Sequence, residues 1–375
     1  MKFIHVSDTH LGFNAYRTLC TDPGPHKGLN QREVDTYRSF EKFVDDAIEL
    51  RPDAILHSGD LFDSIRPSNR TLGFAMEQFL RLSREGIPIV IIAGNHSMPR
   101  IRETGSVFRL FDHIEGVHCI YRGGYEKIRI GDMTVHGLPY GEGDGYLSQL
   151  DSIASTDSRY NVMMLHAGVS SLKAFQNPNT NEQVIEDSHL QKNMDYVALG
   201  HYHGYQKILD NAYYSGSTER FSFSEARQEK GYLIVDLDKG TKEFVSLPAR
   251  KMIDLPYIDA LHLDVESLTK EIEDLIPDDV DGAIVRMTIN RVLNSVRSSI
   301  NVKKIKEQFS TAAHFDLRMI SSSDKMSVQS TSAVFGHIED EFVSFVNARP
   351  IENIDKQHIK ELGLNYLKKE MGQSD

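Results

Sequence analysis

The sequence has few cysteines and no long hydrophobic run. Only Cys20 and Cys119 occur among its 375 residues, and they stand far apart. This excludes a disulfide framework and a thiolate zinc site, and it favours a reducing, intracellular compartment. No apolar stretch approaches the roughly 20 residues that a membrane-spanning helix needs. The first ten residues also contain charged and polar groups, so we expect a cytoplasmic protein.

Positive charge is also scarce, with 42 Lys and Arg against 54 Asp and Glu and a net charge of −12. This balance argues against nonspecific coating of nucleic acid, which usually needs a basic domain. It does not exclude an enzyme that acts on nucleic acid, because acidic side chains at a metal site add to the negative count.

Residues 282–306 are basic, in contrast to the acidic chain as a whole. Residues 282–306 contain no Asp or Glu and directly follow the acidic residues 264–281. The basic side chains of the stretch are Arg286, Arg291, Arg297, Lys303, Lys304 and Lys306. Two interpretations are equally open: a solvated charged face, and a strip that follows a phosphate backbone.

Short apolar runs alternate with longer amphipathic runs over the first two-thirds of the chain, which is typical of an α/β fold or a layered α/β sandwich. Strands are predicted in "KFIHVSD", "AILHSGD", "IPIVIIAGNH", "NVMMLHAG" and "YVALGHYH". Helices are predicted over 32–50 and 70–84, and "RIGDM" (129–133) indicates an antiparallel hairpin.

The pattern begins again after Pro248. The runs "LTKEIEDLI", "AIVRMTINRV", "VKKIKEQFS" and "HFDLRMIS" predict helix, strand, helix and strand, and thus a small α+β unit over 252–322. A serine-rich stretch then indicates a linker, and the last part of the chain is helical in pattern. The expected domains are therefore 1–250, 251–322, a linker at 323–338 and a tail at 339–375.

Each of the five predicted strands ends in side chains that bind metals. They are Asp8 and His10 in "SDTH", Asp60 in "GDLFD", Asn95 and His96 in "GNH", His166 in "LHAG", and His201 and His203 in "GHYH". Functional groups collect at the carboxyl ends of strands in an open α/β sheet, so we expect these side chains to share one crevice. By contrast, His5, His57 and His136 lie inside strand-like runs, and we expect them to be packed or hydrogen-bonded.

Together the motifs DxH, GDxxD, GNH, a later His and GHxH resemble the calcineurin-like metallophosphoesterase superfamily over residues 1–250. Within it, "HVSDTHLG", "GDLFDSIRPS" and "GSTERFSFSEARQEKGY" resemble the double-strand-break repair nucleases of the SbcD and meiotic recombination type. The resemblance implies a layered αββα sandwich with a smaller α+β capping domain, which contacts DNA, and a helical tail. Phe221 and Phe223 in the last motif are expected in the core, with the path to the metals as the alternative.

The resemblance also implies two metal ions. One would be held by Asp8, His10, Asp60 and His203, and the other by Asp60, Asn95, His166 and His201. Imidazole, carboxylate and amide ligands favour Mn²⁺, with other first-row ions or Mg²⁺ as alternatives. The ions would activate a water for attack on phosphorus, and His96 would assist the leaving oxygen.

Two positions depart from the family pattern. Ser97 stands where an acidic residue usually follows GNH, and Asp63 stands where many relatives carry a second histidine. We expect both to lie behind the metal ligands and not among them.

The implied function is a DNA nuclease of double-strand-break repair, an exonuclease on duplex ends and an endonuclease on single strands, associated with the nucleoid. Two alternatives are a phosphoesterase for phosphoproteins, cyclic nucleotides or small esters, and a binding scaffold that has lost its metals. The nuclease-like flanks and the added C-terminal unit favour the nuclease, and the intact ligand set argues against the scaffold.

The implied partners are DNA, a second copy of the chain and an SbcC-type ABC ATPase with a coiled coil. The dimer contact is expected at Val107, Leu110 and Phe111 in "SVFRLFDHI", unless these residues pack on their own sheet. The tail would grip the ATPase through an apolar stripe, unless it folds back on residues 252–322. That stripe consists of Ile351, Ile354, Leu362, Tyr366 and Leu367.

Overall fold

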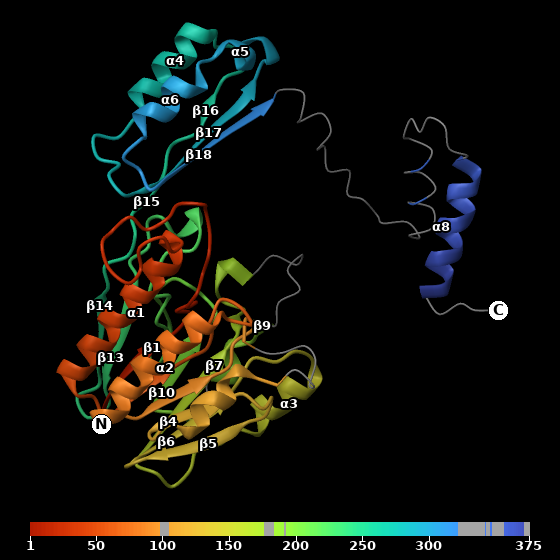
Figure 1. Ribbon diagram of the computed structural model, residues 1–375. Coiled ribbons are helices and arrows are strands. Elements are labelled where there is room, and N and C mark those ends of the chain that lie inside the picture. Colours follow the sequence, from red (N-terminus) through yellow and green to blue (C-terminus); the bar gives the residue numbers. More distant parts are fainter. Residues whose placement is uncertain are drawn as a thin grey trace.

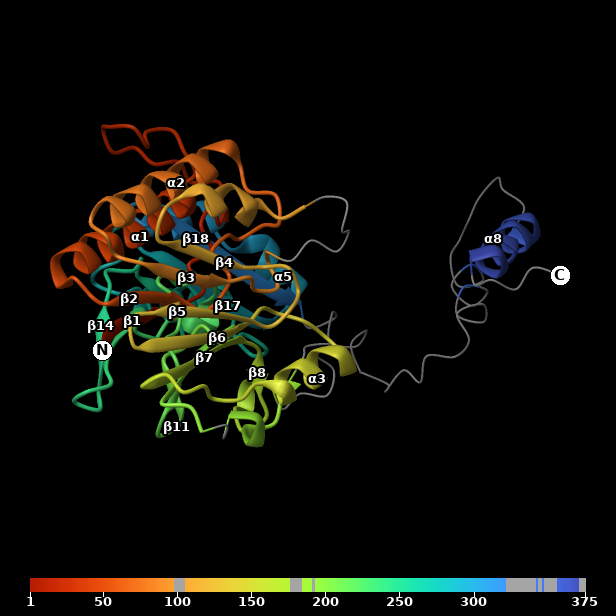
Figure 2. The same ribbon diagram turned by 90° about the horizontal axis from the view of Figure 1, so that it is seen from below.

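The structure is a computed structural model that describes residues 1–97, 105–175, 184–190, 193–321, 342, 346 and 356–370. Two six-stranded sheets stacked face to face form its main body, and a smaller sheet lies at one end of them (Figures 1 and 2). No helix of these described residues is long and apolar enough to cross a membrane.

The first sheet has the order β14-β13-β1-β2-β3-β4, in which β1 to β4 run parallel, β13 pairs antiparallel with β1, and β14 pairs antiparallel with β13. Its strands are β1 (Lys2–Val6), β2 (Ala54–His57), β3 (Ile89–Ile92), β4 (Val117–Ile120), β13 (Gly231–Asp236) and β14 (Thr241–Ser246). The runs predicted as the first three strands are confirmed.

The second sheet has the order β11-β12-β10-β7-β6-β5, in which β6, β7, β10 and β12 are parallel. Its strands are β5 (Glu126–Ile130), β6 (Met133–Leu138), β7 (Tyr160–His166), β10 (Tyr196–Gly200), β11 (Gln206–Leu209) and β12 (Ala212–Tyr214). The hairpin predicted at "RIGDM" is the antiparallel pair β5 and β6.

Alternate side chains of the central strands enter different hydrophobic layers, which explains why these strands are apolar on both faces. In β1, Phe3 joins the core between the two sheets, whereas Ile4 and Val6 face helices on the outside. Those helices are α1 (Gln31–Leu50) and α2 (Asn69–Arg84), which cover one face of the first sheet (Figure 2). The short helix α3 (Asp144–Ser152) packs on the outer face of the second sheet. The layered αββα sandwich expected from the sequence is confirmed.

Side-chain caps start both long helices close to the predicted positions. The Asn30 side chain accepts hydrogen bonds from two backbone amides at the start of α1, and the Ser68 hydroxyl accepts one from Thr71 N in α2. Such caps contribute about 1 kcal/mol each. Helix α1 ends at Leu50, and the left-handed backbone of the following Arg51 (φ 50°) turns the chain towards β2.

Residues 252–321 form a third sheet with a hydrophobic core of its own. Its strands are all parallel: β15 (Met252–Asp254), β16 (Ile258–Asp259), β17 (Ile284–Val292) and β18 (His314–Ser321). Its helices are α4 (Val265–Asp274), α5 (Asn294–Ser299) and α6 (Val302–Gln308). The predicted order of helix, strand, helix and strand corresponds to α4, β17, α6 and β18.

Arg250 joins this unit to the sandwich. Its guanidinium donates to both Asp35 carboxylate oxygens, at 2.5 and 2.6 Å, and to the carbonyl oxygen of Gly282 at 2.6 Å. Asp35 belongs to α1, and Gly282 directly precedes the strand region of the small unit. One side chain therefore links both parts of the chain at their junction.

Carboxylates accompany most cations of the basic stretch. Arg286 donates to Asp254 at 2.9 Å, and Arg291 donates to Asp259 at 2.7 Å. Lys304 likewise donates to Glu273, and Lys303 lies 3.9 Å from Glu307. This pairing favours the solvated charged face over a strip reserved for phosphate.

The remaining described elements are short, apart from α8 (Lys356–Glu370). They are η2 (Val107–His113), η3 (Lys173–Phe175), η4 (Asp187–Leu190), η5 (Phe223–Glu225), β8 (Gly168–Val169) and β9 (Val184–Ile185). The expected linker at 323–338 and two residues of the tail's expected stripe, Ile351 and Ile354, lie outside the described residues.

The segment expected at the dimer contact is a 3-10 helix, η2, and its residues do not share one exposed face. Phe111 is fully buried in the core beneath α2, whereas Leu110 is 47% exposed and Val107 is partly buried. The expectation that Phe111 contributes to a surface is therefore wrong, because three residues per turn rotate it towards the sheet.

Candidate metal centre

The candidate ligands lie at the carboxyl ends of β1, β2, β3, β7 and β10 or on the loops that follow them, and His166 is itself the last residue of β7. Three of these strands belong to the first sheet and two to the second. The carboxyl ends of both sheets open towards the same side, where a cavity of about 320 Å³ is lined by Asp60, Asn95, His96, His201 and His203 among others. The crevice therefore lies at the carboxyl ends of strands from two stacked sheets, and not at the edge of one open sheet.

Glycines allow these loops to approach each other closely. A Cβ atom on Gly94 would lie 2.2 Å from Asp60 Oδ1, and one on Gly200 would lie 2.0 Å from the carbonyl oxygen of Ser58. Any side chain at these positions would push the loops apart. This explains why glycine precedes the ligand residues in "GNH" and "GHYH".

Strained backbone is concentrated at the same place. Asp8 (φ 51°), His10 (φ 43°), Asp60 (φ 52°) and His201 (φ 96°) have left-handed conformations that non-glycine residues rarely adopt. Each such conformation costs of order 1–3 kcal/mol, and strained residues of this kind cluster at sites where the orientation of a side chain matters for function. Hydrogen bonds between the loops hold the strain, including His10 N to Asp60 O at 3.0 Å.

Two sets of ligand atoms form around Asp60. In the first, atoms of Asp8, His10 and His203 lie within 4.8 Å of one another. In the second, His166 Nε2 lies 3.0 Å from Asn95 Oδ1 and 3.3 Å from Asp60 Oδ2, and His201 Nδ1 lies 3.2 Å from Asn95 Oδ1. Asp60 Oδ2 is also 3.9 Å from His10 Nε2, so this carboxylate lies between the two sets.

The chemistry of these atoms fits bound cations. His203 Nδ1 faces the Glu225 carboxylate at 3.1 Å, and His166 Nδ1 faces the carbonyl oxygen of Ser58 at 2.8 Å. Each Nδ1 therefore carries its ring's proton, which leaves a lone pair on Nε2 when the ring is neutral. The lone pair of His166 Nε2 faces the carboxylate of Asp60 and the amide oxygen of Asn95. His203 Nε2 lies only 3.2 Å from His10 Nε2. So many electron-pair donors in one place repel each other, and a bound metal cation would stabilise them.

Comparison with known proteins agrees with this geometry. The family model described as calcineurin-like phosphoesterase matches residues 1–205, which is more than half of the chain. The chain belongs to the calcineurin-like phosphoesterase family. Membership implies that this phosphoesterase binds divalent metal, which the two ligand sets support.

Curated relatives extend the likeness beyond that domain. The DNA double-strand break repair protein Mre11 of Methanocaldococcus jannaschii is 28% identical over 389 residues, covering 99% of this chain and 91% of that protein. The Mre11 protein of Methanococcus maripaludis is 31% identical over 253 residues, 63% of each chain. That of Sulfolobus acidocaldarius is 26% identical over 292 residues, covering 74% of this chain and 72% of its own. The resemblance to nucleases of the SbcD and meiotic recombination type is confirmed.

A solved structure from Thermus thermophilus, that of TT1561, is 17% identical, with a TM-score of 0.39, over 65% of this chain and 98% of that chain. This likeness is too weak for any conclusion about the phosphoesterase.

His96 stands beside the ligand sets with one ring nitrogen directed away from them. Its Nδ1 donates to the carbonyl oxygen of Asp63 at 2.8 Å, and its backbone N donates to Asp60 Oδ1 at 3.0 Å. Its ring lies 4.8 Å from that of His10, edge to face, and it lines the cavity. The second ring nitrogen, Nε2, is thus the one that could exchange a proton with a bound molecule.

The two departures from the family pattern differ in their surroundings. Asp63 Oδ1 lies 3.4 Å from His10 Nδ1, so its carboxylate stands behind a candidate ligand. Ser97 is buried, and its hydroxyl has no hydrogen-bond partner among the residues that the structure describes. No hydrogen bond in that part of the chain joins the Ser97 hydroxyl to His96.

Electrostatics keep the centre of the phosphoesterase site ionised. Burial disfavours the Asp60 carboxylate, but the imidazoles of His166, His10 and His96 hold the pKa of Asp60 well below its usual range. Burial lowers the pKa of His166, but the Asp60 carboxylate outweighs burial and raises it to about 9. Positive charge next to Asp60 is therefore strongly favoured, either as a proton or as a cation.

The sequence assigned no role to Glu225 or Phe175, and it offered contact with the metal site only as an alternative for Phe221. Burial raises the pKa of Glu225, but His203 and Lys230 together bring it down to about 2, so Glu225 is a carboxylate at neutral pH. Phe175 stacks on His201, with ring centroids 5.4 Å apart, and Phe221 contacts the rings of His10 and His203 edge to face. Glu225 and Phe221 lie in the motif "GSTERFSFSEARQEKGY", so the family resemblance was the one available signal.

Phe221 and Phe223 take different positions. Phe221 lies against the ligand histidines, which is the alternative that the sequence left open. Phe223 is buried with Met252 and Ile284 at the junction with the small unit, as expected for a core residue.

Histidines inside the strands are structural, as predicted. His5 bonds to Tyr196 OH at 3.0 Å and to Leu199 O at 3.2 Å, and His57 bonds to the Thr9 hydroxyl at 3.1 Å. His136 lies between Tyr125 OH and Asn161. All three are buried.

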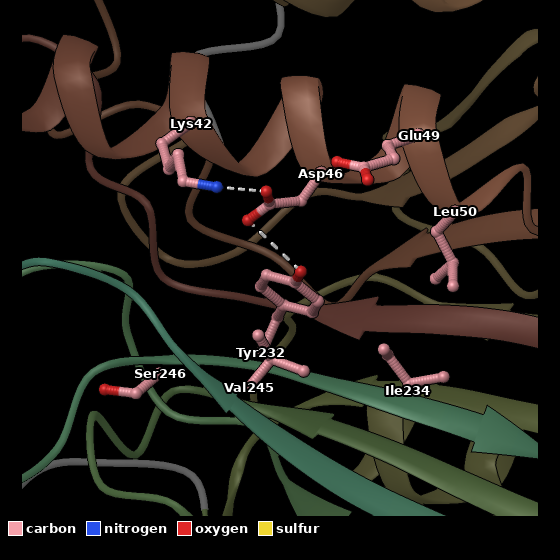
Figure 3. Close-up of a pocket in the computed structure, with 8 residues that line it drawn as sticks. All are labelled: Lys42, Asp46, Glu49, Leu50, Tyr232, Ile234, Val245 and Ser246. Carbon is pink, nitrogen blue, oxygen red and sulfur yellow. Dashed lines mark hydrogen bonds and ion pairs between the residues drawn. The ribbon is translucent and has the colours of Figure 1, made fainter.

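A larger hollow of about 530 Å³ lies between α1 and the strands β13 and β14 (Figure 3). Its apolar lining includes Leu50 from α1 and Ile234 and Val245 from the strands, and its Lys42 is paired with Asp46. It shares no lining residue with the metal centre, and no group of metal ligands was found there among the described residues.

Proposed function

We propose that this phosphoesterase is a metal-dependent DNA nuclease of double-strand-break repair. The observation that carries the proposal is the convergence of seven candidate ligands and His96 on one crevice, in a chain that aligns over 99% of its length with a DNA double-strand break repair protein. The finer assignment is an exonuclease on duplex ends and an endonuclease on single strands, acting on the nucleoid in the cytoplasm.

Asp8, His10, Asp60 and His203 would hold one ion, and Asp60, Asn95, His166 and His201 the other. Mn²⁺ is the favoured ion, because imidazole and amide ligands suit it better than Mg²⁺. When bound, the two ions neutralise the phosphoryl oxygens and make a water nucleophilic at neutral pH. The left-handed backbone conformations of the loops would orient the ligand side chains, and the glycines allow the loops to lie close together.

His96 would assist departure of the leaving oxygen. Its Nδ1 proton is committed to the carbonyl oxygen of Asp63. When the ring is protonated, Nε2 carries the transferable proton, and it lies at the cavity wall where a substrate phosphodiester would sit. Asp63 orients both His96, through its carbonyl, and His10, through its carboxylate.

Residues 251–322 would narrow access to the crevice and contact the DNA backbone as a capping domain. Because most of its basic side chains are paired with carboxylates, nonspecific charge attraction would contribute little to this contact. The proposed partners are a second copy of the chain and an SbcC-type ABC ATPase.

Release of nucleotides from linear duplex DNA tests the proposal directly. We expect hydrolysis with Mn²⁺, weaker hydrolysis with Mg²⁺, and none with a chelator. Asp60→Ala serves as the inactive control, and a circular single strand tests the endonuclease. Hydrolysis of a chromogenic phosphate ester without any action on DNA would contradict the nuclease assignment.

A further inference from the structure

One buried ion pair holds His203 at its ring and at its backbone. Its Nδ1 lies 3.1 Å from Glu225 Oε1, and its carbonyl oxygen accepts a hydrogen bond from Lys230 Nζ at 2.8 Å. Lys230 Nζ also donates to Glu225 Oε2 at 2.6 Å. Glu225 is 5% exposed and Lys230 is 1% exposed. The three residues therefore form a closed ring of contacts, in which the two charged side chains are buried.

Further hydrogen bonds orient the pair itself. Lys230 Nζ also lies 2.9 Å from Ser217 Oγ and 3.0 Å from Gln228 Oε1, so its three N–H groups are shared among four nearby acceptors. Glu225 accepts from Phe221 N at 3.2 Å and from the Ser222 hydroxyl at 3.1 Å. Both members are thus held by several groups, and neither is free to rotate.

Stability is a poor reason for this arrangement. The desolvation of a buried ion pair offsets most of its Coulomb attraction, and apolar side chains of similar volume often stabilise a protein as well or better. The pair does, however, hold the imidazole of His203 in place through both its ring and its backbone. Its location beside His203 therefore indicates a role in the metal centre.

The partner of His203 also differs chemically from that of His166. His166 Nδ1 donates to a backbone carbonyl, that of Ser58, whereas His203 Nδ1 donates to a full negative charge. A carboxylate partner fixes the Nδ1-protonated tautomer and makes Nε2 a stronger electron donor. That Nε2 atom lies 3.2 Å from His10 Nε2, on the side of the ligand set of Asp8 and His10.

We propose that Glu225 and Lys230 are positioning residues for His203, which hold its Nε2 towards the ion on the side of Asp8 and His10. Glu225 sets the tautomer and the ring orientation. Lys230 holds both the carboxylate and the backbone of residue 203. The inference rests on the metal binding in the proposed function and adds two residues to the site.

Metal titration by calorimetry, with Mn²⁺ alone as the probe, tests the inference. We expect Glu225→Ala to bind one of its two ions about 10 to 100-fold more weakly, the usual effect of losing such a partner, and the other ion normally. Glu229→Ala is the matched control, because Glu229 is an exposed carboxylate in the same segment. Equal affinities for both ions in Glu225→Ala and the wild type would overturn the proposal.

Two double variants separate positioning from folding, because Glu225→Ala leaves Lys230 buried without its counter-charge. Glu225→Gln with Lys230→Met is neutral and keeps an acceptor for His203 Nδ1. Glu225→Leu with Lys230→Met is also neutral but has no acceptor. We expect the first to retain most of the affinity and the second to lose it. Identical metal affinities in the two double variants would overturn the proposal.

The wild-type chain offers a readout that needs no variant. With Zn²⁺ bound, nitrogen NMR of the imidazoles should show His203 protonated at Nδ1 and metal-bound at Nε2, and the opposite tautomer would overturn the inference. A wild-type chain that bound no metal would overturn the proposed function as well. Normal metal binding by the wild type and by both double variants would overturn this inference alone.

Discussion

His96 and Asp60 have ligand atoms within 4.8 Å of each other, but their loss should have different results. His96→Ala removes a proton donor and leaves the shared ligand in place. We expect it to retain metal and to lower DNA hydrolysis by roughly two to four orders of magnitude. Asp60→Ala should lose both metal and activity.

Metal content and single-turnover rate, measured on the same samples, distinguish these two residues. His96→Ala that is isolated without metal would show that His96 is a ligand and not a proton donor. His136→Gln is a suitable control, because that histidine lies in the second sheet and bonds to Tyr125 and Asn161.

The buried His5 should make the fold sensitive to acid. Burial lowers its pKa to about 3, against 6.5 in an unfolded chain. Between these values the unfolded state binds one more proton than the folded state, so the free energy of unfolding falls as the pH falls below 6.5. The expected slope from this one group is about 1.4 kcal/mol per pH unit.

Urea unfolding between pH 7.5 and pH 4.5 measures this slope. His5→Gln cannot take up a proton, so its stability should fall less steeply than that of the wild type over this range, although it starts lower. Parallel curves for the two chains would show that His5 is not the responsible group.

Among the elements, η2 is the place to test the proposed dimer. Leu110 is 47% exposed, whereas Phe111 packs edge to face on Phe79 in the core. Leu110→Glu should therefore leave the fold intact and weaken self-association, because it places a charge on an apolar contact. Light scattering at micromolar concentration gives the mass. A monomeric wild type, with Leu110→Glu unchanged, would exclude this surface.

The tail gives the second prediction for an element. Leu362 and Tyr366 are 48% and 63% exposed on α8, and such side chains can enter a groove on a partner. Truncation after Met326 should abolish co-purification with the ATPase and leave Mn²⁺-dependent hydrolysis by the isolated chain largely unchanged. Full affinity of the truncated chain would assign the tail to the chain's own structure.

For the whole molecule, metal should act as a stabilising ligand. The native site gathers carboxylates and imidazoles that are separated in the unfolded chain, so cations bind the folded state preferentially. Free Mn²⁺ at 100 times its dissociation constant should add about 2.7 kcal/mol per site. Calorimetric melting with Mn²⁺ and with chelator measures the shift, which should be much smaller in Asp60→Ala. Equal melting temperatures with and without Mn²⁺ in the wild type would count against a preformed site.

The sequence alone was sufficient for the local structure and for naming the candidate ligands, which the structure brings together in one place. The apolar runs ending in Asp8, Asp60 and His166 predicted strands, and those strands are present. The helices α1 and α2 begin within one residue of their predicted starts, because capping and amphipathic spacing are local properties. The ordered motifs were specific enough to identify the family.

Tertiary structure decided which distant residues meet. The placement of β1, β2 and β3 in one sheet and β7 and β10 in another depends on pairing between strands far apart in the chain, which no local pattern encodes. The same packing rotated Phe111 into the core, paired the basic stretch with carboxylates, and set Glu225 and Lys230 behind His203. A sequence specifies the chemistry of each side chain, but the neighbours of a buried charge are set by the fold, because burial must supply every such group with a partner.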